Sequence, residues 1–106
     1  MHREAEDAVR NLRGRMSAET KTLKELEQKF QHPYFKKRAS RAINDAEEAE
    51  IMFLRALEKE NWRDVQQEMA AVGYAEMIFQ MAVAQRKHLE ELMAKYGPTA
   101  TVVPYP

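Results

Sequence analysis

The sequence predicts a small all-α protein, a bundle of three long amphipathic helices that run up, down and up. Two observations support this fold class. The chain has 106 residues with only three glycines and four prolines, and its abundant Ala, Glu, Lys, Gln, Met and Leu favour helices over strands. Its apolar side chains also recur every three or four residues over long stretches, with interruptions near residues 32 and 61. This spacing places them on one face of a helix.

The first helix is predicted over residues 3–30. Its apolar side chains recur at steps of three and four residues and form a heptad seam: Val9, Leu12, Met16, Leu23, Leu26 and Phe30. Glu19 fills the one seam position between Met16 and Leu23 that is not apolar. Ser17 suits a helix N-cap and Gly14 lies just before it, so a break near residues 14–17 is the alternative. One continuous helix is favoured, because the seam keeps its phase across this segment.

The second helix is predicted over residues 34–60. Pro33 ends the first helix and suits the first turn of the second, where the N–H group that proline lacks would have no hydrogen-bond partner within the helix. An apolar stripe then follows at helical spacing: Phe35, Ala39, Ala42, Ala46, Ala49, Phe53 and Ala56. The alanines should let a neighbouring helix approach closely, while Ile43, Leu54 and Leu57 form a second stripe.

The third helix is predicted over residues 62–96, as the longest and central helix. Asn61 suits an N-cap with Asp64 three residues later, and Gly97 followed by Pro98 suits a helix end. The turn near Asn61 is short, so the second and third helices should be antiparallel neighbours. Residues 1–96 are thus expected to form one domain, and residues 97–106 an extended tail or linker.

The third helix is apolar on nearly every side between residues 69 and 84. A helix of this kind is buried on every side, yet two neighbours in a three-helix bundle leave one side uncovered. A second copy of the chain is the simplest cover. The predicted interface consists of Met69, Val72, Tyr74, Met77, Ile78 and Met81.

Several classes of activity lack their usual residues in this sequence. There are no cysteines and only three histidines, so thiolate metal sites, cysteine nucleophiles and paired Glu-x-x-His motifs are absent. No phosphate-binding glycine loop or nucleophile elbow occurs. We therefore expect no enzyme and no cofactor. The lack of cysteine, of a signal sequence and of a long apolar run favours a cytoplasmic protein without a membrane span.

Charge is unevenly distributed along the chain. Lys plus Arg and Asp plus Glu both number 17, but residues 1–41 carry a net charge of +5 and residues 42–106 a net charge of −5. The most basic cluster is expected at the start of the second helix, beside Tyr34: Lys36, Lys37, Arg38 and Arg41. Such a cluster is either a solvated helix face or a nucleic-acid surface.

Three glutamates are candidates for a metal-binding layer. Folding the chain about residues 32 and 61 places Glu19, Glu47 and Glu76 at one level, and clustered carboxylates suit a hard metal ion. The alternative is that all three tilt into water, because long helices drift from a strict heptad.

The function that the sequence favours is a non-enzymatic protein–protein interaction module, an adaptor, assembly subunit or regulatory partner that forms a dimer through the third helix. A nucleic-acid-associated regulator and a carboxylate-layer metal protein are the alternatives.

Overall fold

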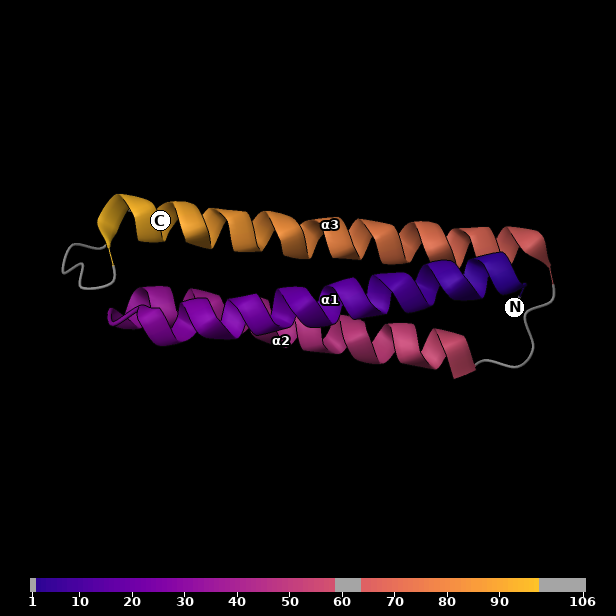
Figure 1. Cartoon of the computed structure of the whole chain (residues 1–106), viewed down its shortest axis with the longest axis horizontal. Helices are drawn as coiled ribbons and strands as arrows, with labels where there is room; N and C mark the ends of the chain where they lie inside the picture. Colours follow the sequence, from indigo (N-terminus) through magenta and orange to yellow (C-terminus); the bar gives the residue numbers. More distant parts are fainter. Residues whose placement is uncertain (1, 59–63, 98–106) are drawn as a thin grey trace.

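The computed structural model describes residues 2–58 and 64–97 and contains three long helices, as predicted. Helix α1 spans Arg3–Lys29, α2 spans Pro33–Glu58 and α3 spans Val65–Tyr96. They run up, down and up in a rod of 53 × 19 × 16 Å (Figure 1). The predicted cap Asn61 and nearly all of the predicted tail lie outside the described residues.

Helix α1 is continuous through Gly14 and Ser17, so the favoured prediction of one helix is confirmed. Its buried residues follow the predicted seam with one change, since Thr20 rather than Glu19 lies in the core. The Thr20 hydroxyl donates a hydrogen bond of 3.0 Å to the backbone carbonyl of Met16, which satisfies this buried polar group.

Helix α2 begins at Pro33 and is capped by the side chain of His32, whose Nδ1 accepts a hydrogen bond of 3.1 Å from the backbone N–H of Tyr34. The predicted apolar stripe from Phe35 to Phe53 is buried, with four alanines along its length. Because alanine side chains are short, α1 and α2 pack closely. Of the second predicted stripe, Ile43 is buried, whereas Leu54 is exposed.

Helix α3 begins three residues later than predicted. Asp64, which the sequence placed inside the helix, is its N-cap and accepts a hydrogen bond of 2.8 Å from the backbone N–H of Gln67. The predicted end is confirmed: Gly97 adopts a φ of 75°, and its N–H donates to the carbonyl of Met93. A positive φ of this size favours glycine over residues with a side chain.

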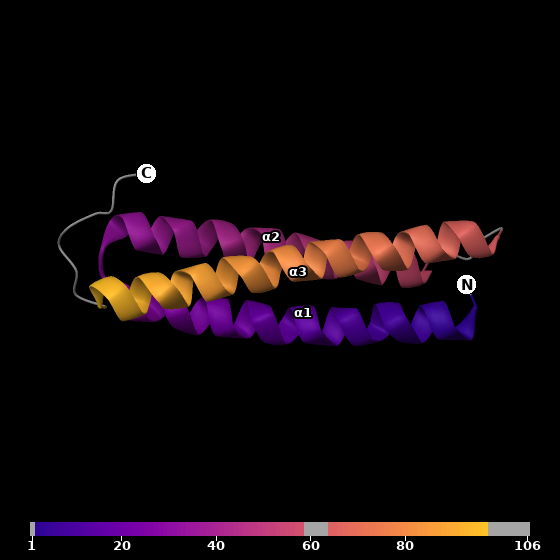
Figure 2. The same cartoon turned by 90° about the horizontal axis from the view of Figure 1, so that it is seen from above.

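The core lies along the line where the three helices meet, and its largest fully buried side chains come from α1, α2 and the turn between them: Val9, Met16, Leu23, Phe30 and Phe35. Phe35 stacks on Phe30 and on Tyr96, which attaches the end of α3 to this turn. Although the sequence favoured α3 as the central helix, it lies across the α1–α2 layer at a slight inclination (Figure 2). One side of α3 is therefore left uncovered.

Candidate functional site

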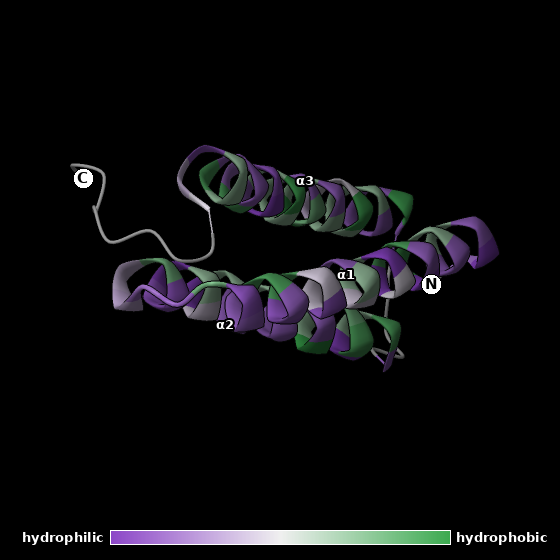
Figure 3. Ribbon diagram, turned by 60° about the vertical axis from the view of Figure 1, so that its left-hand side comes forward, coloured by the Kyte–Doolittle hydropathy of each residue, from purple (hydrophilic) through white to green (hydrophobic). Residues whose placement is uncertain are grey.

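The uncovered side of α3 carries more exposed apolar side chains than any other surface of the described residues. Five apolar side chains of α3 are more than half exposed, one in its first turn, Val65 (53%), and four further along the helix: Met69 (68%), Tyr74 (55%), Met77 (51%) and Met81 (57%). Figure 3 shows hydrophobic residues on several sides of α3, including the side that faces away from α1 and α2. We call these four residues the α3 face.

The predicted interface of six residues is divided by the structure. The four residues of the α3 face are exposed, whereas Val72 and Ile78 are partly buried against the core. When a helix is apolar on every side, the side that packs against its two neighbours is buried, and only the remaining sides stay exposed to solvent. The prediction that two neighbours leave one side of α3 uncovered agrees with these exposures.

Three residues of the α3 face, Tyr74, Met77 and Met81, belong to a regular seam. Residues 70, 74, 77, 81 and 84 are separated by steps of four and three, and they are Ala, Tyr, Met, Met and Ala. This is the spacing at which a helix packs along another helix. The sequence alone does not distinguish this exposed seam from the buried stripe of α3, because both consist of apolar residues.

The α3 face is poor in charge. Residues 65–85 contain no Lys or Arg and only two acids, Glu68 and Glu76. Glu68 points away from this face and is 3% exposed. Both of its oxygens lie 2.6 Å from His2, one from the backbone nitrogen and the other from Nδ1. Glu76 is therefore the only charged residue of this stretch that is open to solvent.

The contact between His2 and Glu68 attaches the start of α1 to the start of α3. Burial by itself raises the pKa of Glu68, but the hydrogen bonds from His2 outweigh it and hold the pKa below its usual value. Beside this contact, α1 and α3 border an apolar hollow of about 800 Å³ lined in part by Ala5, Ala8 and Met69. The hollow is open where α3 diverges from α1.

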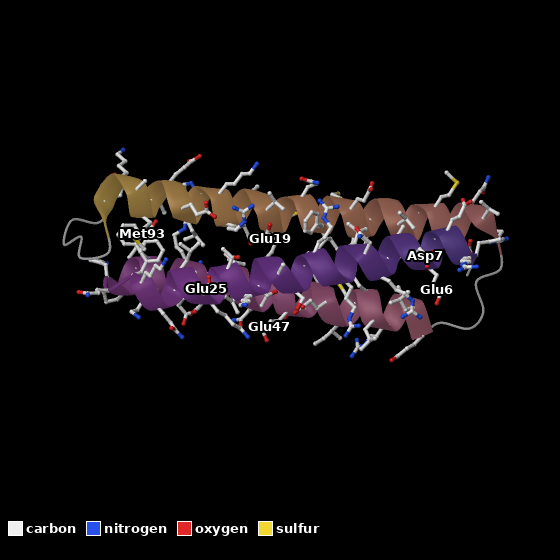
Figure 4. All side chains as sticks on the ribbon, in the orientation of Figure 1. Glu6, Asp7, Glu19, Glu25, Glu47 and Met93 are labelled. Atoms are coloured by element: carbon white, nitrogen blue, oxygen red, sulfur yellow. The ribbon has the colours of Figure 1, made fainter. Side chains whose placement is uncertain are left out.

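The predicted carboxylate layer does not form. Glu19 pairs with Arg86 between α1 and α3, and Arg86 also donates a hydrogen bond of 2.6 Å to Glu90. These bonds raise the pKa of Arg86. Glu47 lies along α2 with its carboxylate 3.7 Å from the Lys24 ammonium. Figure 4 shows Glu19 directed toward α3 and Glu47 at the opposite edge of the bundle.

The position of α3 along the bundle axis explains the error. Residues of α3 contact residues of α1 that are 66 or 67 positions earlier. Glu76 is thus level with Arg10 and about 14 Å along the axis from Glu19. The prediction had instead placed Glu76 at the level of Glu19. Within the described residues, no three potential ligands come together in a way that suits a metal ion.

The predicted basic cluster is open to solvent. Lys36, Lys37, Arg38 and Arg41 are all exposed, and none of them forms an ion pair with a residue that the structure describes. Lys36 turns toward α1, where its Nζ lies 3.5 Å from the carbonyl of Glu27. Arg38 turns the other way and contacts the hydroxyl of Tyr34 at 3.4 Å. Lys36 and Arg38 therefore lie on different sides of α2.

The fold and the α3 face define a small helical bundle with one apolar helix face open to solvent. No family model, no curated protein and no solved structure matches this chain. None of the helices in the described ranges is long and apolar enough to cross a bilayer.

Proposed function

We propose that this protein is a non-enzymatic helical interaction module that forms a dimer through the α3 face. The observation that carries the proposal is the exposure of Met69, Tyr74, Met77 and Met81 on one helix. Contiguous apolar surface of this kind marks interaction sites in proteins, and methionine is favoured at adaptable helix-binding surfaces. Adaptor, assembly and regulatory roles all use such a surface, and the cytoplasm is the proposed location.

A second copy of the chain fits the α3 face for two reasons. In an antiparallel pair of α3 helices centred near Phe79, Met77 meets the partner's Met81, and Tyr74 meets the partner's Ala84. Large side chains then lie opposite small or flexible ones, which suits close packing. The seam also brings no like charges together, because the stretch from Val65 to Gln85 contains no Lys or Arg and only two acids.

The size of the contact predicts a moderate affinity. The 21 residues from Val65 to Gln85 extend over about 30 Å of helix. A single helix pair of this length buries less than the roughly 800 Å² per partner of a standard interface. We therefore expect dissociation in the micromolar range rather than an obligate dimer.

Size-exclusion chromatography with light scattering tests the proposal. The natural chain should show the mass of a dimer at tens of micromolar, and Met77→Glu should be monomeric because it places a charge in the contact. Ile51→Glu is the matched control, since Ile51 is 50% exposed on α2 and lies outside the α3 face; this variant should remain dimeric. A folded natural chain that is monomeric at about 100 μM would contradict the proposal.

Nucleic-acid binding is the second candidate function. It is favoured by the exposure of Lys36, Lys37, Arg38 and Arg41 without ion pairs to described residues. Binding of a DNA or RNA oligonucleotide that weakens steeply with salt would support it, and no binding at low salt would exclude it.

A further inference from the structure

Helices α2 and α3 border a groove whose α3 rim shares Tyr74 and Met81 with the α3 face. Two hollows lie along it, of about 430 Å³ and about 120 Å³. Both are lined by Asp45 and Gln85, so they are adjacent. The larger hollow lies toward the start of α2, where α3 inclines toward α1 and away from α2 (Figure 2).

The two rims of the groove have helical spacing. On α2, Arg38, Asp45 and Met52 are seven residues apart, and on α3 so are Tyr74, Met81 and His88. Residues seven apart lie on one side of a helix. Because α2 and α3 are antiparallel, Met52 is level with the segment near Tyr74, and Arg38 is level with the segment near His88.

The groove is apolar at one end and basic at the other. Met81 lines the smaller hollow at the apolar end, and the seven-residue spacing places the exposed side chains of Met52 and Tyr74 beyond it. Two arginines, Arg38 and Arg41, line the other end together with His88, Tyr34 and a single acid, Asp45. The guanidinium of Arg38 lies 6.0 Å from the centre of the Tyr34 ring, and neither arginine forms an ion pair with a described residue.

We propose that this groove binds an amphipathic helix of another protein, one that is apolar over its first turns and acidic over its last. Such a helix completes a four-helix arrangement with α1, α2 and α3. Its acids pair with Arg38 and Arg41, and the negative end of its dipole lies beside the same two arginines. The proposal rests on the protein being an interaction module and does not require that it dimerise.

A second copy of the chain is the less suitable occupant. Its α3 carries Arg86, Lys87 and His88 directly after the apolar stretch, so a parallel α3 would set cations against the two arginines. In the antiparallel orientation, the residues beyond the apolar stretch are Gln67 and Gln66, which are neutral, and Asp64, which caps the helix. The acids therefore come from a different protein.

Fluorescence anisotropy with a designed peptide tests this inference. The probe is a labelled helix of about 20 residues, or about 30 Å, with Leu and Ile at heptad positions and Glu in its last two turns. We expect it to bind the full chain, and to bind at least about tenfold more weakly to the double variant Arg38→Glu/Arg41→Glu. Binding should also weaken as salt is added.

Two controls isolate the groove. Lys36→Glu/Lys37→Glu reverses two charges on the same helix outside the groove and should bind the peptide within about twofold of the natural chain, because these lysines do not touch it. A peptide with Lys in place of each Glu should not bind. All four positions are exposed, so circular dichroism should show unchanged folding.

Several results would overturn the inference: no binding of the acidic peptide, equal binding of both peptides, or an equal loss in the two double variants. Loss of the dimer in Arg38→Glu/Arg41→Glu would assign the groove to a second copy instead. Salt-dependent binding of an oligonucleotide that both double variants lose would assign the cations to nucleic acid. A monomeric natural chain that binds the peptide would contradict only the dimer.

Discussion

The α1–α2 pair and α3 use apolar residues in opposite ways. On α1 and α2, nearly every apolar residue of the main stripes is buried, and the four buried alanines of α2 let the two helices pack closely. Helix α3 carries the most exposed apolar side chains of the described residues, and the same segment has only a narrow buried stripe, formed by Ala75, Phe79 and Ala82. The first pair thus supplies the core, and α3 supplies surface as well.

This difference has a simple physical origin. A helix contributes to folding only through the side that its neighbours cover. Met69, Tyr74, Met77 and Met81 gain little from folding of the single chain, because more than half of each remains in water. Because folding of the single chain gains little from these side chains, we assign the α3 face to binding.

The largest expected effect is the loss of an aromatic side chain from the core. Phe35 is 1% exposed and contacts Phe30 and Tyr96, so Phe35→Ala should lower the free energy of unfolding by about 3–5 kcal/mol. Tyr74→Ala is the matched change on the α3 face and should alter it by less than about 0.5 kcal/mol. Urea denaturation of dilute protein measures both. Equal losses would contradict the division between core and surface.

A smaller effect is expected from the ion pair that joins α1 to α3. The Glu19 side chain is 13% exposed, and Glu19→Ala should lower the free energy of unfolding by about 1–3 kcal/mol, because Arg86 then remains partly buried without this partner. Glu47→Ala removes the exposed pair with Lys24 and should cost less than about 1 kcal/mol. The same urea titration compares them. A larger loss for Glu47→Ala would mean that α3 is not attached through Glu19.

The smallest expected effect, and the only stabilising one, comes from two helical glycines. A Cβ atom added at Gly14 or Gly73 meets nothing within 4 Å, so Gly14→Ala and Gly73→Ala should each stabilise the protein by about 0.5–1 kcal/mol. Gly97→Ala should destabilise it instead, because Gly97 has a φ of 75°. Thermal denaturation of dilute protein is the measurement. Destabilisation by Gly73→Ala would show that α3 is more tightly covered than the structure indicates.

Most of the fold was predictable because its signals are local. Pro33 begins α2, Gly97 follows the end of α3, and the spacing of apolar residues gives the buried sides of α1 and α2. The continuity of α1 followed from the unbroken phase of its seam. The start of α3 was less predictable, because both Asn61 and Asp64 have side chains suited to capping a helix.

The candidate site was only partly predictable. Of the six predicted interface residues, the structure exposes Met69, Tyr74, Met77 and Met81, whereas Val72 and Ile78 turn toward the core. Glu19 was a candidate for a carboxylate layer, and its pairing with Arg86 was missed. The groove between α2 and α3 was not foreseen, because its two rims come from segments that are about 40 residues apart and each rim by itself resembles an ordinary solvated face.

The amino-acid sequence by itself determined that there are three helices, where two of them begin and end, and that α3 has more apolar surface than two neighbours cover. Only the tertiary structure decided which part of that surface is open, how far α3 is displaced along α1, and which charges meet. The physical reason is that periodicity specifies the angle of each side chain around its own helix. The axial position and the inclination of one helix on another depend on how all three pack together.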